Sequence, residues 1–149
     1  MYVFSYILYS IEDVHNGLKY VLYTKQYYYE EAESKCADDG GTLAMAKDTE
    51  TFDVLMVMLK AYIAQGGTSY EAFLDGSKET EFDSWECVNA QGDCPATMPW
   101  KKGEPNDPRG QQCVAISARS AEGLIGKDCF LKRTAICQFA IDDEFIKTT

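Results

Sequence analysis

The chain has 149 residues and is strongly acidic, because 24 aspartate and glutamate side chains outnumber 14 lysine and arginine side chains. Its formal net charge of -10 at pH 7 repels phosphate backbones and anionic lipid head groups, so nucleic acid and membrane surfaces are not expected partners. No apolar stretch approaches the roughly 20 residues of a membrane span, and residues 1–10 lack the basic start and cleavage site of a signal peptide. We therefore expect one soluble domain over residues 1–149, in a mature form and without membrane insertion.

The cysteines indicate an oxidising compartment. There are six of them, Cys36, Cys87, Cys94, Cys113, Cys129 and Cys137. Six cysteines allow 15 pairings, and their spacing alone does not choose among these. Zinc sites usually draw on close C-x-x-C pairs and on histidines, whereas this chain has no such pair and only one histidine, His15. We therefore expect three disulfides in a secreted, extracellular protein.

The amino-terminal segment is rich in tyrosine and has the pattern of a β-hairpin. Residues 2–10 and 18–26 have strand-like composition, and Asn16-Gly17 between them is typical of a two-residue turn. This pattern predicts a hairpin over about residues 1–25. The tyrosines are more consistent with a structural role, in sheet pairing and aromatic packing, than with stacking on a sugar.

Two helices are predicted after the hairpin. Tyr28, Ala32 and Cys36 recur four residues apart and are followed by Gly40 and Gly41, which are suited to ending a helix. A second amphipathic helix is predicted from an N-cap at Asp48 or Thr49 to the glycines at 66–67. Its apolar face consists of Phe52, Leu55, Met56, Leu59 and Ile63.

The second half of the chain has the pattern of short strands around one long irregular segment. Strands are predicted at 73–78, running into an Asp75-Gly76 turn, and at 82–87, 113–117 and 134–140. Residues 88–111 are rich in glycine, proline, asparagine and glutamine, and loops of this length are usually functional or disordered. Trp85 and Trp100 flank this loop, and we expect both in the core in preference to a ligand site. The acidic residues 141–145 are predicted to be a solvated end.

The order of short motifs along the chain resembles that of C-type lectin-like domains. The motifs are a helix with a cysteine, GG-x-LA, a second helix, FLDGS, W-x-C, MPW-x-x-GEPN, QCVAI, KDC and AICQF. The resemblance covers residues 18–139. It implies an α+β fold in which two helices pack on small antiparallel sheets beside a long loop held by a disulfide. It also implies the bridges Cys36–Cys137 and Cys113–Cys129, which leaves Cys87 to pair with Cys94.

The triplet Glu104-Pro105-Asn106 is the part of the resemblance that implies a ligand. In members with this triplet a cis proline directs the glutamate and asparagine oxygens at one calcium ion, which accepts two neighbouring sugar hydroxyls. Calcium takes six to eight oxygen ligands, so Glu104 and Asn106 would supply a part of the set. The EPN triplet, as opposed to QPD, implies a mannose-like glycan as the partner and calcium as the cofactor.

The chain departs from the calcium-binding pattern at three positions. Gln111 stands where members usually have an acid, and Ile125 and Gly126 stand where they usually have Asn-Asp. Asp128 is the candidate replacement ligand, although Lys127 beside it would repel a divalent ion or form a salt bridge in its place. The sequence thus predicts weakened calcium affinity at a site of Glu104, Asn106, Gln111 and Asp128.

The sequence also bears on two other classes of function, calcium-independent binding and catalysis. In the alternative binding class, GEPND is a rigid turn whose side chains are satisfied by loop amides, in a calcium-independent module that binds a protein or mineral surface. The chain is not expected to be an enzyme, because His15 has no sequence neighbour that suits nucleophilic catalysis and paired acids such as Asp38-Asp39 and Asp142-Asp143 point apart. The sequence leaves the oligomeric state open.

Overall fold

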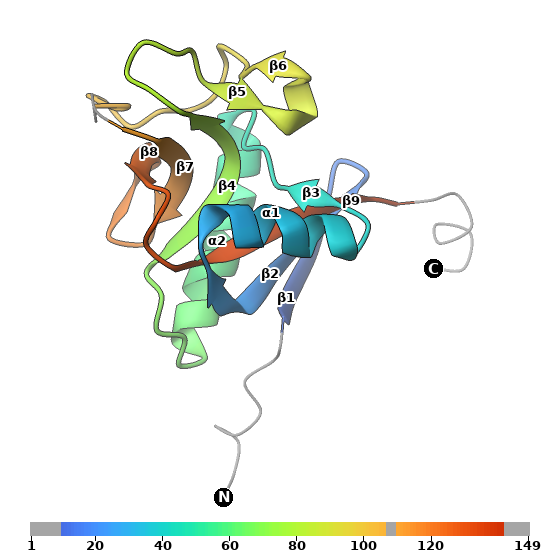
Figure 1. Cartoon of the computed structure of the whole chain (residues 1–149). Helices are drawn as coiled ribbons and strands as arrows, with labels where there is room; N and C mark the ends of the chain where they lie inside the picture. The colour runs from blue at the N-terminus through green and yellow to red at the C-terminus, as the bar shows by residue number, and fades with distance from the viewer. Residues whose placement is uncertain (1–9, 107–109, 142–149) are drawn as a thin grey trace, which may run out of the picture.

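The computed structural model describes residues 10–106 and 110–141, which form helices and strands (Figure 1). The strands are β1 (Ser10–His15), β2 (Leu18–Tyr27), β3 (Thr42–Leu43), β4 (Glu71–Lys78), β5 (Glu86–Cys87), β6 (Gly92–Asp93), β7 (Gln112–Ser117), β8 (Ser120–Asp128) and β9 (Arg133–Ala140). The helices are α1 (Tyr29–Asp38), α2 (Thr49–Ala64) and the 3-10 helix η2 (Val88–Ala90). This content confirms the predicted α+β class. No helix among the described residues is long and apolar enough to cross a membrane.

The predicted amino-terminal hairpin is present, with different bounds. β1 and β2 pair antiparallel around Asn16 and Gly17, whose φ angles of 49° and 78° suit a tight turn that continues the strand twist. β1 covers residues 10–15, whereas the predicted first strand covered residues 2–10 and lies outside the described residues except for Ser10. Tyr20 and Tyr29 are 2% and 3% exposed, as expected of structural tyrosines.

The strands form one connected sheet with the order β1-β2-β9-β4-β5-β6. In addition, β3 pairs with β9, and β7 pairs with both β4 and β8. β9 lies between β2 and β4, and it pairs antiparallel with β2 but parallel with β4, at Ala72 and Phe73. In place of the predicted small antiparallel sheets, the strands form one connected sheet with this parallel pair. Because β9 runs opposite to β2 and in the same direction as β4, the two strands on either side of it run in opposite directions.

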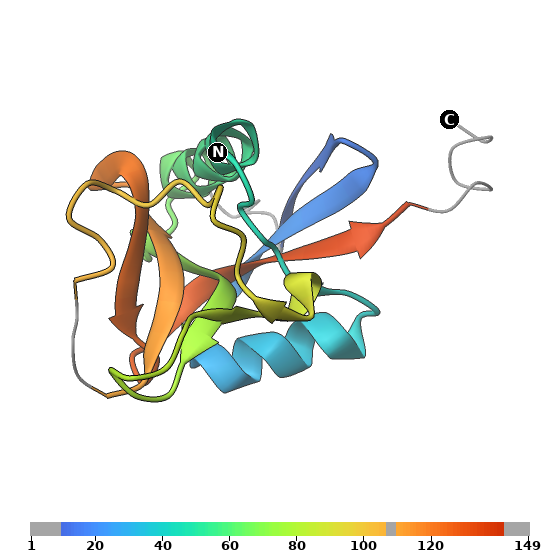
Figure 2. The same cartoon turned by 90° about the horizontal axis from the view of Figure 1, so that it is seen from above.

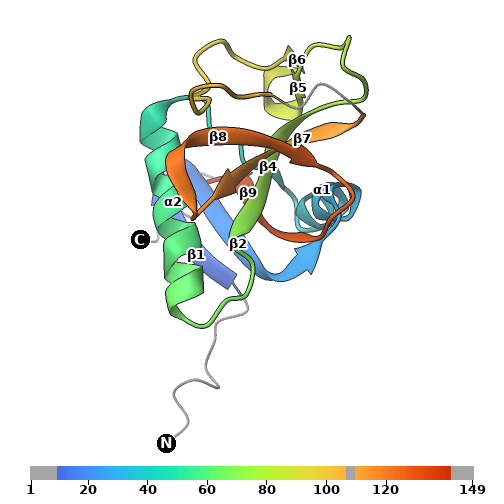
Figure 3. The same ribbon diagram turned by 90° about the vertical axis from the view of Figure 1, so that its left-hand side faces the viewer.

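The two long helices lie on opposite sides of this central part of the sheet (Figure 3). Side chains of β9 alternate between them, since Ile136 belongs to the apolar cluster of α2 while Cys137 belongs to the cluster of α1. The α2 cluster includes the fully buried Leu55 and Leu59. A central strand that is buried on both faces explains why residues 134–140 are nearly all apolar.

Three disulfides fix the elements, and their pairing is the one that the resemblance implies. Cys36–Cys137 ties α1 to β9, Cys113–Cys129 ties β7 to the end of β8, and Cys87–Cys94 closes a short loop. Their sequence separations are 101, 16 and 7 residues, respectively. The first bridge therefore removes the most freedom from the unfolded chain.

Three sequence predictions in the second half of the chain are corrected. Asp75-Gly76 is not a turn, because β4 runs through it with a register shift, and Gly76 at φ 140° sits where a Cβ would lie 2.4 Å from Val114. The strand predicted at 82–87 shrinks to β5, and Phe82 is 89% exposed. β8 was missed, because glycine and lysine interrupt its apolar pattern; its pairing with β7 supplies the order that its sequence lacks.

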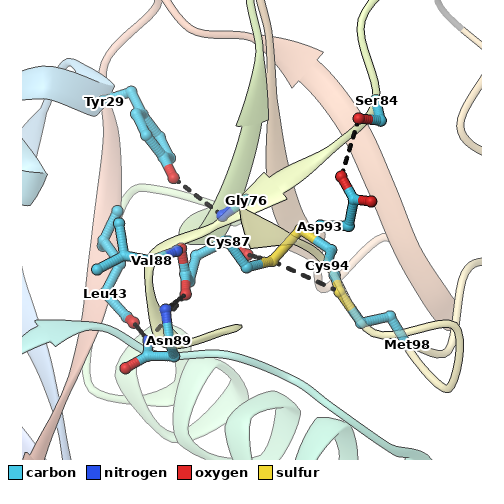
Figure 4. Close-up of a disulfide and its surroundings, with 11 residues drawn as sticks. Tyr29, Leu43, Gly76, Ser84, Cys87, Val88, Asn89, Asp93, Cys94 and Met98 are labelled. Carbon is cyan, nitrogen blue, oxygen red and sulfur yellow. Dashed lines mark hydrogen bonds between the residues drawn. A yellow bond between two sulfur atoms is a disulfide. The ribbon is translucent and has the colours of Figure 1, made fainter. Parts of the chain in front are cut away.

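A buried polar network anchors the start of the long loop (Figure 4). The carboxylate of Asp75 accepts hydrogen bonds from the backbone N–H groups of Val88 and Asn89 at 2.9 Å each. The amide of Asn89 donates to the Leu43 carbonyl and to Asp75, both at 2.8 Å, and its oxygen accepts from Thr42 at 2.9 Å. Burial raises the pKa of Asp75, and the hydrogen bonds from Asn89 and Val88 oppose that rise. The network joins β3, β4 and η2.

The disulfides should contribute unequally to stability. Replacing Cys36 and Cys137 by alanine opens a loop of 101 residues and should cost about 4 to 5 kcal/mol, whereas opening the 7-residue loop of Cys87 and Cys94 should cost only about 2 kcal/mol. Urea unfolding of both double variants, after non-reducing peptide mapping of the wild type, measures the difference. An equal loss, or a mapped pairing that differs from the three bridges, would contradict the role given to Cys36–Cys137.

The network around Asn89 predicts that one substitution of this residue lowers the stability of the fold in a pH-dependent way. Asn89→Ala should cost about 1 to 3 kcal/mol at every pH, because it leaves buried partners unpaired. Asn89→Asp should cost more at pH 7, since it places a carboxylate against Asp75 and against the Leu43 carbonyl. The pair takes up protons more readily folded than unfolded, so the excess loss should shrink as the pH falls towards 4. Urea midpoints across this range test it, and parallel pH profiles for the two variants would count against the network.

Candidate functional site

The long loop returns along the outer side of the β7–β8 hairpin, where the candidate site lies (Figure 2). The loop pairs with β8 at Trp100 and Leu124, through hydrogen bonds of 2.9 Å from the Leu124 N–H to the Pro99 carbonyl and 3.0 Å from the Lys101 N–H to the Leu124 carbonyl. Gly123 permits this approach, because a Cβ there would lie 2.4 Å from the Lys101 nitrogen. The loop is thus held against the sheet by its backbone.

The two tryptophan side chains pack between the loop and the core. Trp85 and Trp100 are partly buried, pack against the core cluster of α2, and contact each other with ring centroids 5.0 Å apart. Both rings therefore pack on the core, as predicted, but neither belongs to its buried residues. A Cβ at Gly126 would lie 3.4 Å from the Trp85 ring and 3.6 Å from Pro105, so Gly126 fills a narrow space between this ring and the EPN triplet.

Glu104 and Asn106 line an open groove of about 690 Å³ between the loop and the hairpin. The peptide bond between Glu104 and Pro105 is cis. Glu104 is held at both ends, because its backbone N–H donates to the Lys101 carbonyl at 2.8 Å and its carboxylate accepts from the Gly126 N–H at 3.0 Å. One side-chain oxygen of Glu104 is therefore already used by a backbone amide of β8, whereas the alternative interpretation of GEPND expects amides of the loop.

The four residues predicted for the site do not all line the same groove. Asp128 lines the groove of Glu104 and Asn106, and its carboxylate accepts a hydrogen bond of 2.8 Å from the Phe130 N–H. Gln111 instead lines a separate acidic groove with Tyr29. The structure thus brings three of the four together. Residues 107–109, which connect Asn106 to Gln111, lie outside the described residues.

A group of ion pairs at the floor of the groove was not predicted from the sequence. Glu71 accepts from Arg133 at 2.6 Å and pairs with Lys127 at 3.5 Å. Arg133 is 6% exposed in its side chain and also donates to the Asp128 carbonyl at 2.6 Å and the Leu131 carbonyl at 3.1 Å. Lys127 therefore pairs with Glu71, from β4, and not with a residue of the EPN triplet. Because Glu71 is 62 residues from Arg133, no local sequence pattern signals this contact.

The donor set of the groove does not fit a full calcium site. Ile125 is 6% exposed and apolar, Gly126 offers an N–H to Glu104, and Lys101 and Lys127 line the same groove. Calcium takes six to eight oxygen ligands, which carboxylates, carbonyl groups and waters supply. Within residues 10–106 and 110–141, no group of three or more histidine, cysteine, aspartate or glutamate side chains is placed to hold a metal ion. Two lysines in the groove thus add to the three sequence departures that weaken its fit to calcium.

Known proteins share both sequence and fold with this chain. The family model described as the lectin C-type domain matches residues 25–139. Collectin-10 of Gallus gallus is 32% identical over 127 residues, which are 80% of this chain and 41% of the relative, so the chain spans under half of that protein.

Solved structures agree on the fold. Human lithostathine superposes with a TM-score of 0.73 at 14% identity, covering 87% of this chain and 97% of that chain. A calcium-independent type II antifreeze protein superposes with a TM-score of 0.67 at 18% identity, covering 87% and 91%. With the family model matching residues 25–139 and the α+β fold in common, the chain belongs to the C-type lectin domain family.

Proposed function

We propose that the protein is a glycan-binding lectin domain whose groove between the long loop and the β7–β8 hairpin holds a mannose-type sugar without a strong requirement for calcium. The observation that carries this proposal is that Glu104, Asn106 and Asp128 converge on one open groove. Charged and amide oxygens with amide N–H donors are the groups that bind pairs of sugar hydroxyls. The EPN triplet supports mannose over galactose through the family resemblance.

The hydrogen bonding of Glu104 leaves it able to bind a sugar directly. Gly126 occupies Oε1, so the second carboxylate oxygen is available to accept from a hydroxyl, and the Asn106 amide offers both a donor and an acceptor beside it. The bond to Gly126 also fixes the carboxylate before a ligand arrives, which lowers the ordering cost of binding. In this proposal Glu104 and Asn106 make direct hydrogen bonds to the sugar.

Calcium contributes little in this proposal. The positive charges of Lys101 and Lys127 in the groove oppose a divalent cation, and Ile125 supplies no oxygen side chain. We expect calcium affinity no tighter than about 10⁻⁴ to 10⁻³ M, the weak end of extracellular sites. The similarity of fold to a calcium-independent antifreeze protein is compatible with a family member that needs no calcium.

In this proposal the protein is a non-catalytic binding module that acts outside the cell. Three disulfides and a collectin relative support an oxidising, extracellular environment. A second candidate, binding of a protein surface, is favoured by the exposed side chains of Phe130 and Leu131, which are 63% and 58% exposed beside the groove. Isothermal titration with mannose separates the two candidate functions.

Isothermal titration of the wild type with mannose, galactose and calcium tests the sugar site. Mannose should bind in preference to galactose, with or without 5 mM calcium. Glu104→Gln keeps an acceptor for the Gly126 N–H but removes the charge, so it should weaken mannose binding about tenfold. Glu122→Gln, an exposed change in β8 outside the groove, is the matched control and should leave binding unchanged.

Two results would overturn this function. If the wild type gives no heat with mannose, the protein-binding candidate replaces the lectin function. If calcium binds with micromolar affinity and mannose binds only in its presence, the groove is a conventional calcium site and the role given to Lys101 and Lys127 is wrong.

A further inference from the structure

The groove beside Glu104 differs in charge from the protein that surrounds it. Its lining holds four basic side chains, Lys101, Arg119, Lys127 and Arg133, and three acidic ones, Glu71, Glu104 and Asp128. The groove therefore has a net charge of one positive unit in a chain whose net charge is -10. Local excess charge of this kind in a concave site attracts ligands of the opposite sign.

Three other grooves over the described residues show the contrast. The groove of Tyr29 and Gln111 holds five carboxylates and one lysine, and the groove of Tyr23 and Phe139 holds two carboxylates and one lysine. A third groove, along α1, holds three carboxylates and three lysines. An anionic ligand is favoured at the groove of Glu104 and disfavoured at the groove of Tyr29.

The acidic side chains of the groove already have donors. Arg133 and Lys127 neutralise Glu71, at 2.6 and 3.5 Å. Glu104 accepts from the Gly126 N–H at 3.0 Å, and Asp128 accepts from the Phe130 N–H at 2.8 Å. The negative charge in the groove is thus largely satisfied by protein groups before any ligand binds.

Two of the four basic side chains of the groove, Lys101 and Arg119, do not neutralise its carboxylates. Within residues 10–106 and 110–141, neither Lys101 nor Arg119 has a carboxylate partner. The Arg119 guanidinium stacks on the Tyr70 ring, 4.2 Å from its centroid, and stacking fixes the plane of the group while its N–H edges stay free to donate. Lys101 has its backbone fixed by Leu124 and Glu104, so its side chain starts from a rigid point in the loop.

We propose that the glycan recognised by the groove carries an anionic group, such as a phosphate, a sulfate or a carboxylate, that Lys101 and Arg119 bind. This inference rests on the proposed function, since Glu104 and Asn106 bind the hydroxyls of the same sugar. Arginine donates two parallel hydrogen bonds to a planar or tetrahedral oxyanion, and lysine adds a mobile point charge. Lys101, one of the two lysines that oppose calcium, thus becomes a specificity determinant for a charged sugar together with Arg119.

The test compares mannose 6-phosphate, mannuronate, mannose and inorganic phosphate by isothermal titration of the full chain. At least one charged sugar should bind about tenfold tighter than mannose, and raising the salt concentration from 0.05 to 0.5 M NaCl should remove most of this advantage. Comparison of mannose 6-phosphate with mannuronate identifies the oxyanion. Inorganic phosphate should bind more weakly than the charged sugar, because it makes no contact with Glu104 and Asn106.

Variants assign the effect to residues. Lys101→Gln and Arg119→Gln should each reduce the charged-sugar advantage about fivefold while leaving the affinity for mannose unchanged. Lys102→Gln is the matched control, because Lys102 is the exposed neighbour of Lys101 and does not line the groove. Circular dichroism confirms that each variant is folded, and the salt dependence of the wild type tests the proposal independently of any variant.

The outcomes separate this inference from the proposed function. Equal binding of charged and neutral mannose, independent of salt, overturns the anionic ligand and leaves the lectin function in place. Binding of inorganic phosphate as tight as that of the charged sugar shows an anion site without glycan recognition and overturns both. A loss in Lys102→Gln as large as in Lys101→Gln overturns the assignment to the groove.

Discussion

The position of β9 between β2 and β4 is the constraint on which the rest of the structure depends. Ile136 packs towards α2, and Cys137 bonds to Cys36 of α1, so this one strand joins both helices to the sheet. Its parallel pairing with β4 fixes β4 in the centre, and β4 in turn carries β7 and, through β7, the hairpin that forms one wall of the groove. The site is therefore built outward from a strand whose first five residues, 133–137, are buried.

The groove illustrates how a family site changes when single ligands are replaced. Ile125 supplies an apolar side chain, and Gly126 supplies a backbone N–H that donates to the Glu104 carboxylate. Lysine at positions 101 and 127 adds positive charge where the resemblance implies a calcium ion. In the proposed function this positive charge, carried by protein side chains, selects the ligand by charge.

Much of the fold was predictable from the sequence, because local patterns encode it. The helices followed from apolar spacing and from caps such as Asp48, whose side chain accepts from the Thr51 N–H at 2.8 Å, and the hairpin followed from Asn16-Gly17. The strand β8 and the Gly76 bulge were not predictable, since pairing with β7 decides both. In the site, the sequence indicated Glu104, Asn106 and Asp128, but Glu71, Arg119 and Arg133 converge there only through long-range contacts.

The central claim is that ligands of this protein bind between the long loop and the β7–β8 hairpin. Amide chemical-shift mapping of the ¹⁵N-labelled chain during titration with mannose 6-phosphate tests it most directly. The largest changes should occur at Lys101, Glu104, Gly126 and Lys127, with little change along α1. Changes that concentrate instead at the groove of Tyr29 and Glu33, or along the β1–β2 hairpin, would contradict it.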